Sequence, residues 1–268
     1  MQQVQNASSN GGTAGALAAP VLEAHGITKA YGPVQALRGI DFTLYPAEVV
    51  GIVGDNGAGK STFIKILSGA VTPDAGQMAI DGRTVTFHNP LDARRAGLET
   101  VYQDLAVVPL LDIGANLFLG REETYSGPFS FLHILNKRSM RRHAMESISV
   151  LRIGIPSVRQ PVGTLSGGQR QGVAVARAVA WSRKIVILDE PTAALGVREA
   201  RSVLELIKRV RAQGVAVILI SHNMPHVFEV TDRIFVLRHG SHAGTVRTSE
   251  TSMEQVVRLI TGAEVHTA

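Results

Sequence analysis

One glycine-rich segment limits the possible folds of this chain more than any other feature. It follows an apolar, β-branched run at residues 48–53 and precedes apolar residues at helical spacing, and it reads Gly54-Asp55-Asn56-Gly57-Ala58-Gly59-Lys60-Ser61. Glycines permit backbone conformations that aim several N–H groups inward, and the helix that follows adds unsatisfied amides at its positive end. A chance glycine-rich turn is the alternative, and the flanking strand and helix argue against it. The segment matches the P-loop pattern, which cradles nucleotide phosphates and helps to hold Mg²⁺.

Two later runs extend this strand–loop–helix unit into a sheet. Ile185–Leu188 and Val215–Ile220 are continuously apolar, as parallel strands covered on both faces tend to be. Between them, apolar residues from Ala200 to Val210 fall on one helical face. We therefore predict an α/β fold whose sheet is mainly parallel, with a further strand at Arg233–Leu237.

The remaining segments predict further elements around this α/β core. Residues 21–53 alternate short apolar runs with glycine and proline, which predicts small strands and turns. Residues of about 104–165 lack buried-strand patterns and contain a predicted helix at about Met140–Leu151, which indicates a helical insertion. A last amphipathic helix is expected at Ser252–Thr261. Residues 1–20 are polar and small, without a basic start or continuous apolar segment, and are expected to form a flexible tail.

Composition excludes several classes of protein. The chain has 268 residues, 45% of them hydrophobic, which is enough to bury a sizeable core. It contains no cysteine, which excludes disulfides and thiolate metal sites. No apolar run approaches the roughly 20 residues of a membrane-spanning helix. The net charge is +5, but lysines and arginines are scattered and no aromatic–basic signature accompanies them, so no nucleic acid is expected as a partner.

Two acidic residues end the strand at Ile185–Leu188. Open α/β sheets bind ligands at the carboxyl ends of their strands, so Asp189 and Glu190 should face the bound phosphates. Asp189 is expected to hold Mg²⁺ and Glu190 to polarise the water that attacks the terminal phosphate. A pair of surface acids that merely end a strand is the alternative, which the P-loop upstream disfavours.

A second anion-binding element appears far from the first. Leu165-Ser166-Gly167-Gly168-Gln169 directly precedes a helical stretch, which places its serine and glycines at another helix amino terminus. One chain thus carries two phosphate-binding ends that are widely separated in sequence. This arrangement is reasonable if each nucleotide is shared between two copies of the chain.

With these motifs in hand, the chain resembles the nucleotide-binding subunit of an ABC transporter, over residues 21 to about 263. The resemblance implies ATP as the ligand and a compound domain at residues 21–268 with a small antiparallel β subdomain. It also implies further site residues. Tyr31 resembles the aromatic residue that stacks on adenine, Gln103 the glutamine that senses Mg²⁺ and the attacking water, and His222 the switch histidine that contacts the γ-phosphate.

The candidate site therefore has three parts. The catalytic candidates are Glu190, His222 and Gln103, and the Mg²⁺ candidates are Ser61, Gln103 and Asp189. The nucleotide-binding candidates are Tyr31, Gly54, Asp55, Asn56, Gly57, Ala58, Gly59, Lys60, Ser61, Thr62, Ser166, Gly167, Gly168 and Gln169. His222 and His226 could instead form a metal pair, an interpretation we reject because Pro225 should break the helix between them and no third ligand is evident.

One departure from the family pattern stands out. After Asp189-Glu190-Pro191-Thr192 the family commonly ends a small segment with Leu-Asp, whose aspartate contacts the opposing subunit's P-loop, whereas this chain has Leu195-Gly196. Hydrolysis should survive because Glu190 and His222 remain. We expect Gly196→Asp to change cooperativity or coupling more than ATP affinity.

Two short stretches narrow the resemblance. Residues 101–105 and 116–122 resemble the monosaccharide-import ATPases of bacteria, the ribose, xylose and fructose group, and the single domain is most similar to the fructose-type branch. The implied partners are a second copy, transmembrane permease subunits and, indirectly, a periplasmic sugar-binding protein. The implied location is the cytoplasmic face of the inner membrane. An exporter ATPase, a non-transport ABC ATPase and a nucleotide-sensing regulatory subunit are the alternatives.

Overall fold

The computed structural model describes residues 19–125, 133–182 and 184–263. Most of the tail expected at residues 1–20 lies outside them. The described strands are β1 (Leu22–Tyr31), β2 (Val34–Leu44), β3 (Val49–Val53), β4 (Ala75–Ile80), β5 (Arg83–Val85), β6 (Leu98–Val101), β7 (Ile185–Asp189), β8 (Ala216–Ile220), β9 (Arg233–Arg238) and β10 (Ser241–Arg247). The described helices are α1 (Lys60–Leu67), α2 (Pro90–Arg95), α3 (Ile113–Leu117), α4 (Lys137–Val150), α5 (Gly167–Trp181), α6 (Val197–Ala212), α7 (Met224–Val230) and α8 (Met253–Thr261), with short 3₁₀ turns at Val162–Thr164 and Thr248–Glu250.

The described strands form two sheets. A six-stranded sheet runs in the order β10-β9-β3-β8-β7-β6, and only its β9–β10 pair is antiparallel. A four-stranded antiparallel sheet has the order β2-β1-β4-β5. The mainly parallel α/β core and the small antiparallel sheet predicted for this chain are therefore confirmed.

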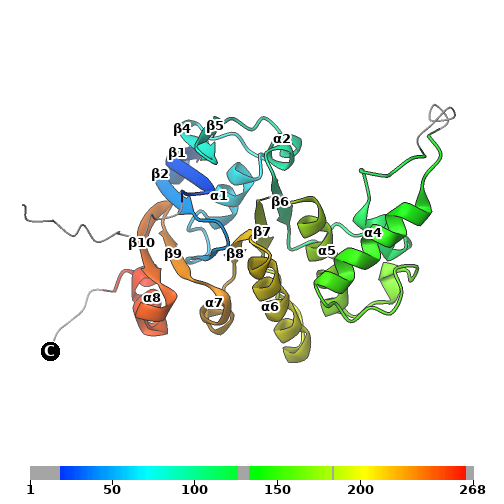
Figure 1. Ribbon diagram of the computed structural model, residues 1–268. Coiled ribbons are helices and arrows are strands. Elements are labelled where there is room, and N and C mark those ends of the chain that lie inside the picture. Colours follow the sequence, from blue (N-terminus) through cyan, green and yellow to red (C-terminus); the bar gives the residue numbers. More distant parts are fainter. Residues whose placement is uncertain (1–18, 126–132, 183, 264–268) are drawn as a thin grey trace, which may run out of the picture.

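Alternate residues of the central strands enter two different cores. Val186 and Leu188 pack with the cluster around α4, α5 and α6, whereas Ile185 and Ile187 pack with α1 and the antiparallel sheet. Figure 1 shows the same layering, with α6, α7 and α8 on one face of the large sheet and α1 with β1, β2 and β4 on the other. Burial on both faces explains why these strands are continuously apolar in sequence.

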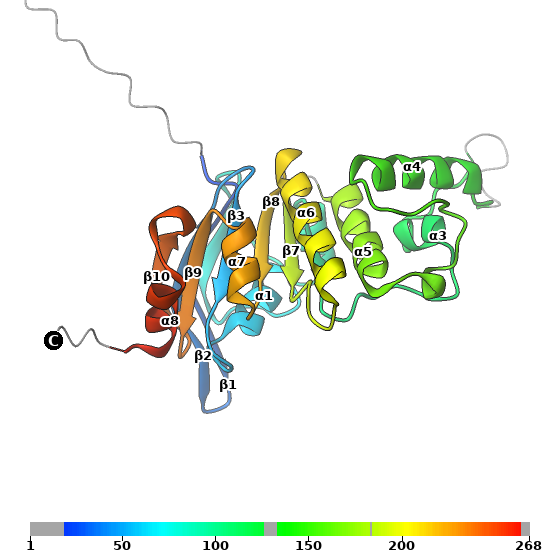
Figure 2. The ribbon, with the colours of Figure 1, turned by 90° about the horizontal axis from the view of Figure 1, so that it is seen from below.

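The described part of the segment between β6 and α5 contains helices α3 and α4, joined by irregular stretches, and no strand is assigned in it. Figure 2 places α3 and α4 at the end of the molecule away from β10 and α8, with α5 between them and the sheet. Helix α4 begins three residues earlier than predicted, because the Asn136 side chain caps the backbone N–H of Ser139. Strands β4, β5, β6 and β10 and the short helix α2 were not predicted.

None of the described helices has the length and apolar character that crossing a bilayer requires.

Candidate functional site

The glycine-rich loop takes backbone conformations that explain its composition. Gly57 and Gly59 have φ angles of 77° and 102°, in the left-handed region that glycine adopts without strain. Gly59 is the N-cap of α1 and has no side-chain cap, and a Cβ atom there would stand 2.8 Å from the Ala36 carbonyl oxygen. The loop therefore leaves the amino terminus of α1 open and close to β2, as a phosphate cradle requires.

Lys60 is folded back onto this loop. Its Nζ atom donates to the carbonyl oxygens of Gly54 and Asp55, at 2.7 Å and 2.9 Å. Burial lowers the pKa of the Lys60 ammonium, while the charges of Glu190, Asp55 and Asp189 oppose that shift. The ammonium thus lies among acidic groups at the loop, where an incoming phosphate would exchange for the carbonyl contacts.

Asp189 and Glu190 differ in surroundings and backbone. Asp189 closes β7, and its burial together with the Glu190 charge raises its pKa, against the opposing charges of Lys60 and Lys65. Glu190 has a φ of 49°, the left-handed region that is strained for a residue with a side chain. Strain of this kind is kept at functional sites because the surrounding structure enforces it.

His222 holds the Glu190 carboxylate from the neighbouring strand end. The His222 Nδ1 atom lies 2.9 Å from Glu190 Oε1, and the His222 backbone N–H donates to the same oxygen at 3.1 Å. The Glu190 side chain is 16% exposed, whereas that of His222 is 76% exposed. His222 therefore orients the carboxylate while leaving its own ring open to the groove.

Most of the expected residues meet in one groove of about 790 Å³. It is lined by Gly54, Asp55, Asn56, Gly57, Ala58, Gly59, Lys60, Ser61, Thr62, Gln103, Asp189, Glu190 and His222, and also by Val34, Gln35, Ala36 and Ile220. The last four were missed from sequence, although three of them begin β2 just across the hairpin turn from Tyr31. The groove thus joins residues from five separate parts of the chain.

Tyr31 is not among the residues that line this groove. Its side chain is exposed at the end of β1, and the Lys29 ammonium lies 5.8 Å from its ring centroid. Val34, on the far side of the hairpin turn, supplies the apolar lining instead and is 62% exposed. The groove lining therefore does not include Tyr31, and its stacking on adenine stays a prediction.

The proposed metal ligands fit Mg²⁺ in chemistry and position. Ser61, Gln103 and Asp189 all line the groove, and each offers an oxygen donor. Mg²⁺ prefers a few protein oxygens supplemented by phosphate oxygens and water. No cluster of three or more histidine, cysteine or acidic residues suited to a metal occurs in the described ranges, so any metal here would depend on the phosphates as well.

The second predicted phosphate-binding element lies elsewhere. Ser166 caps α5, where its hydroxyl accepts from the Gln169 backbone N–H, and the Gln169 side chain accepts in return from the Ser166 N–H. Ser166, Gly168 and Gln169 line a separate groove of about 580 Å³ between α5 and α6. Within one chain the two phosphate-binding elements do not share a groove.

The Gly196 position lies beside this second element. Gly196 is the N-cap of α6 and carries no side-chain cap, and a Cβ atom there would stand 2.6 Å from the Glu199 carboxylate. The Glu199 side chain also packs over Gly168 of α5, 2.7 Å from a Cβ built at that glycine. The space next to the missing aspartate is therefore already taken by a carboxylate three residues later in the chain.

The two histidines considered as a metal pair have other partners. His222 bonds Glu190, and His226 Nδ1 lies 3.0 Å from the Thr192 hydroxyl. The expectation that Pro225 breaks the helix is wrong, because Pro225 occupies the first turn of α7, where its missing N–H is not needed. His226 instead links α7 to the segment after Glu190.

Comparison with known proteins assigns the chain to a family. The model of the ABC transporter family matches residues 37–193, from β2 to just beyond Glu190. The chain belongs to the ABC transporter family. Solved ABC cassettes share its fold: a nucleotide-free ATP-binding cassette superposes with a TM-score of 0.77 at 22% identity, covering 90% of this chain and 98% of the cassette. A dimeric bacterial cassette superposes with a TM-score of 0.69 at 23% identity, covering 85% and 98%.

Curated members of the family include much closer relatives of this ABC transporter chain. The fructose import ATP-binding protein FrcA of Rhizobium meliloti is 51% identical, covering 91% of this chain and 95% of its own length. The xylose/arabinose import ATP-binding protein XylG of Sulfolobus acidocaldarius is 45% identical over 90% and 94%. The ribose import ATP-binding protein RbsA of Chromobacterium violaceum is 40% identical, but the chain spans only 47% of it. The length of the chain thus matches the first two relatives rather than the third.

Proposed function

We propose that this chain is the ATP-hydrolysing subunit of an ABC importer for a monosaccharide of the fructose, ribose or xylose type. The observation that carries the proposal is the groove in which the P-loop, Gln103, Asp189, Glu190 and His222 meet. The sugar class follows from the names of the relatives, of which the fructose import protein is 51% identical over nearly its whole length.

The groove residues support separate roles in ATP hydrolysis. The P-loop amides and Lys60 hold the phosphates, while Ser61, Asp189 and Gln103 offer oxygens to Mg²⁺, which would neutralise phosphate charge. Glu190, oriented by His222, polarises the attacking water. The two contacts from His222 hold the Glu190 carboxylate in place before the nucleotide arrives.

The location of the Ser166 element supports a two-copy site. Because Ser166 and Lys60 line different grooves of one chain, we infer that each ATP lies between Lys60 of one copy and Ser166 of another. ATP then favours the closed pair, since a ligand shifts an equilibrium by its differential affinity for the two states. Closure drives permease subunits at the cytoplasmic face of the membrane, and a periplasmic binding protein delivers the sugar.

Phosphate release from the purified chain tests the enzymatic part of the proposal. Wild-type protein with ATP and Mg²⁺ should release phosphate, and Glu190→Gln should be slower by a factor of about 10² to 10⁴, as expected for loss of a general base. ATP affinity, measured by titration with a fluorescent analogue, should be kept in this variant. Equal activity of the two proteins would remove Glu190 from the base role, and absence of turnover in wild type would favour a regulatory subunit.

Transport tests the substrate class. In vesicles that hold ATP inside, the chain together with the membrane protein that co-purifies with it, and with the sugar-binding protein added outside, should support uptake of labelled fructose, ribose or xylose. The Glu190→Gln chain is the matched control and should abolish that uptake. ATP-dependent loss of a substrate from the cytoplasmic side, or no sugar movement despite phosphate release, would contradict an importer of monosaccharides.

A further inference from the structure

Gln103 lies in a short segment between two anchored ones. It lines the nucleotide groove and is exposed, as is Asp104 next to it. Among the described residues, the Gln103 side chain makes no hydrogen bond. Its position in the groove is therefore set by the backbone on either side of it.

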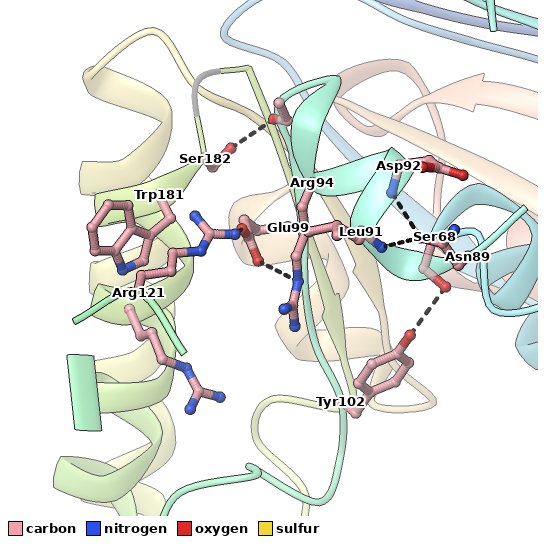
Figure 3. Close-up of polar contacts among 12 residues, drawn as sticks. Ser68, Asn89, Leu91, Asp92, Arg94, Glu99, Tyr102, Arg121, Trp181 and Ser182 are labelled. Carbon is pink, nitrogen blue, oxygen red and sulfur yellow. Dashed lines mark hydrogen bonds and ion pairs between the residues drawn. The ribbon is translucent and has the colours of Figure 1, made fainter. Parts of the chain in front are cut away.

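The anchor before Gln103 leads to the P-loop helix. The Tyr102 hydroxyl donates to Ser68 Oγ at 3.0 Å, and Ser68 is the buried C-cap of α1. The Ser68 hydroxyl donates in turn to the Lys65 carbonyl oxygen inside α1. Figure 3 shows the Tyr102 ring reaching across to Ser68. The residue before Gln103 is thus tied to the carboxyl end of the helix that begins at Lys60.

The anchor after Gln103 leads to the helix that begins at the Ser166 element. Arg177 of α5 donates from Nη1 to the Ala106 carbonyl oxygen at 2.9 Å and from Nη2 to that of Leu105 at 3.2 Å. Ala106 has a φ of 47°, an uncommon conformation for a residue with a side chain. The two guanidinium bonds hold this turn against α5.

The surroundings of the segment are fixed as well. Glu99 of β6 is buried and pairs with Arg121 and, at 3.5 Å, with Arg94. Figure 3 shows the Glu99 side chain between those of Arg121 and Arg94. Arg121 also lies over the Trp181 ring at the end of α5. Buried Asn116 bonds the backbone of residues 108–112. The exposed pair Gln103–Asp104 is therefore the least anchored part of this connection.

We propose that Tyr102 and Arg177 are positioning residues for Gln103, which hold the backbone on either side of it so that its side chain stays at the groove. The inference rests on the proposed function, because it gives Gln103 a role in hydrolysis. Tyr102 ties the backbone before Gln103 to the end of α1, and Arg177 ties the backbone after it to α5. Loss of either anchor lets Gln103 shift within the groove without removing a group that lines it.

A mutant cycle tests this role. Tyr102→Phe removes one hydroxyl, and Arg177→Met removes both guanidinium bonds at similar length. Each should lower kcat for ATP hydrolysis by about 10-fold to 100-fold, the cost of misplacing a reacting group by about 1 Å. KM and the affinity for the ATP analogue should change less than about twofold, because an interaction that acts only in the transition state affects kcat. Arg177→Lys, with a single donor group, should recover part of the loss.

The same variants in a Gln103→Ala background separate positioning from general stability. Residues acting through Gln103 should cost little more once Gln103 is gone, whereas independent structural effects would add. Arg211→Met is the control, because Arg211 of α6 also donates to a backbone carbonyl oxygen, that of Ala47, and pairs with Asp232, both away from this segment. It should leave kcat unchanged. Full additivity in the cycle, or equal losses in kcat and nucleotide affinity, would overturn the proposal.

Limited proteolysis gives a readout that does not depend on turnover. A non-specific protease should cleave within residues 103–107 faster in Arg177→Met and Tyr102→Phe than in wild type, whereas Arg211→Met should leave this cleavage unchanged. Unchanged cleavage in this segment would overturn the anchors even if activity fell. If wild type shows no phosphate release, the proposed function fails, while the cleavage result still decides whether the two anchors exist. Should Arg177→Met not fold, Tyr102→Phe and Arg177→Lys complete the cycle.

Discussion

Asp189 and Glu190 are neighbours in sequence, but their environments give them different chemistry. Burial and the Glu190 charge raise the Asp189 pKa from 3.8 in the nucleotide-free protein, whereas Glu190 is held by two donors from His222. The charged form of Asp189 is thus disfavoured until a cation binds beside it. A raised pKa of this kind is expected of a carboxylate that binds Mg²⁺ only together with the nucleotide.

The Asp189 environment has a consequence for stability. When the pKa of an acid is higher in the folded than in the unfolded chain, the free energy of unfolding falls as the pH rises above the unfolded value, here 3.8. Asp189→Asn should therefore raise the melting temperature of the nucleotide-free protein by a few degrees at pH 7, with a smaller gain at pH 4. Mg²⁺-dependent phosphate release should be lost. A lower melting temperature at pH 7 would contradict the assigned environment.

Gly196 can be tested through its neighbour Glu199. A side chain at Gly196 must displace the Glu199 carboxylate, and aspartate also adds a like charge. At neutral pH, Gly196→Asp should therefore be less stable to denaturant than Gly196→Asp combined with Glu199→Gln, by about 0.5 kcal/mol. The double variant keeps the aspartate as a helix cap. Equal unfolding free energies for the two variants would show that Glu199 moves away without cost.

At the scale of elements, Ser166, the N-cap of helix α5, has two expected roles. Ser166 caps the helix in a reciprocal pair with Gln169, and it is also the expected contact to a second copy's nucleotide. The same reciprocal pair occurs at α8, between Ser252 and Gln255, neither of which lines the two grooves described above. The chain thus contains a control for the capping function alone.

The two caps give a matched prediction. Ser166→Ala and Ser252→Ala should each lower the free energy of unfolding by about 1 kcal/mol, the usual cost of losing such a cap. Only Ser166→Ala should also weaken ATP binding and slow phosphate release. Similar activity losses in both variants would mean that Ser166 acts through helix stability and not through the nucleotide.

Elements differ in how well the sequence predicted them, for physical reasons. Strands β3, β7 and β8 are buried on both faces, so their continuously apolar sequences predict them. Strand β6 lies at the sheet edge and carries Glu99, whose charge is balanced by Arg94 and Arg121, so it shows no such run. The Tyr102 and Arg177 anchors could not be predicted either, because they depend on contacts between segments far apart in the chain.

At the scale of the whole molecule, the chain carries two separate grooves that the proposed function assigns to one nucleotide site. The sequence motifs named most residues that line the first groove, and the structure adds Val34, Gln35, Ala36 and Ile220. Residues of the Ser166 motif line the second groove. Sequence alone could not tell whether one chain brings these motifs together, since that depends on the folded distance between α1 and α5.

The most direct measurement of the two-copy account is the mass of the Glu190→Gln chain in solution. Without nucleotide, this variant should sediment with the mass of a single chain. With ATP and Mg²⁺ it should sediment with twice that mass, and the doubling should disappear when Lys60→Ala or Ser166→Ala is added. A Glu190→Gln chain that binds ATP and yet stays at the mass of one chain would contradict the claim that two copies share each nucleotide.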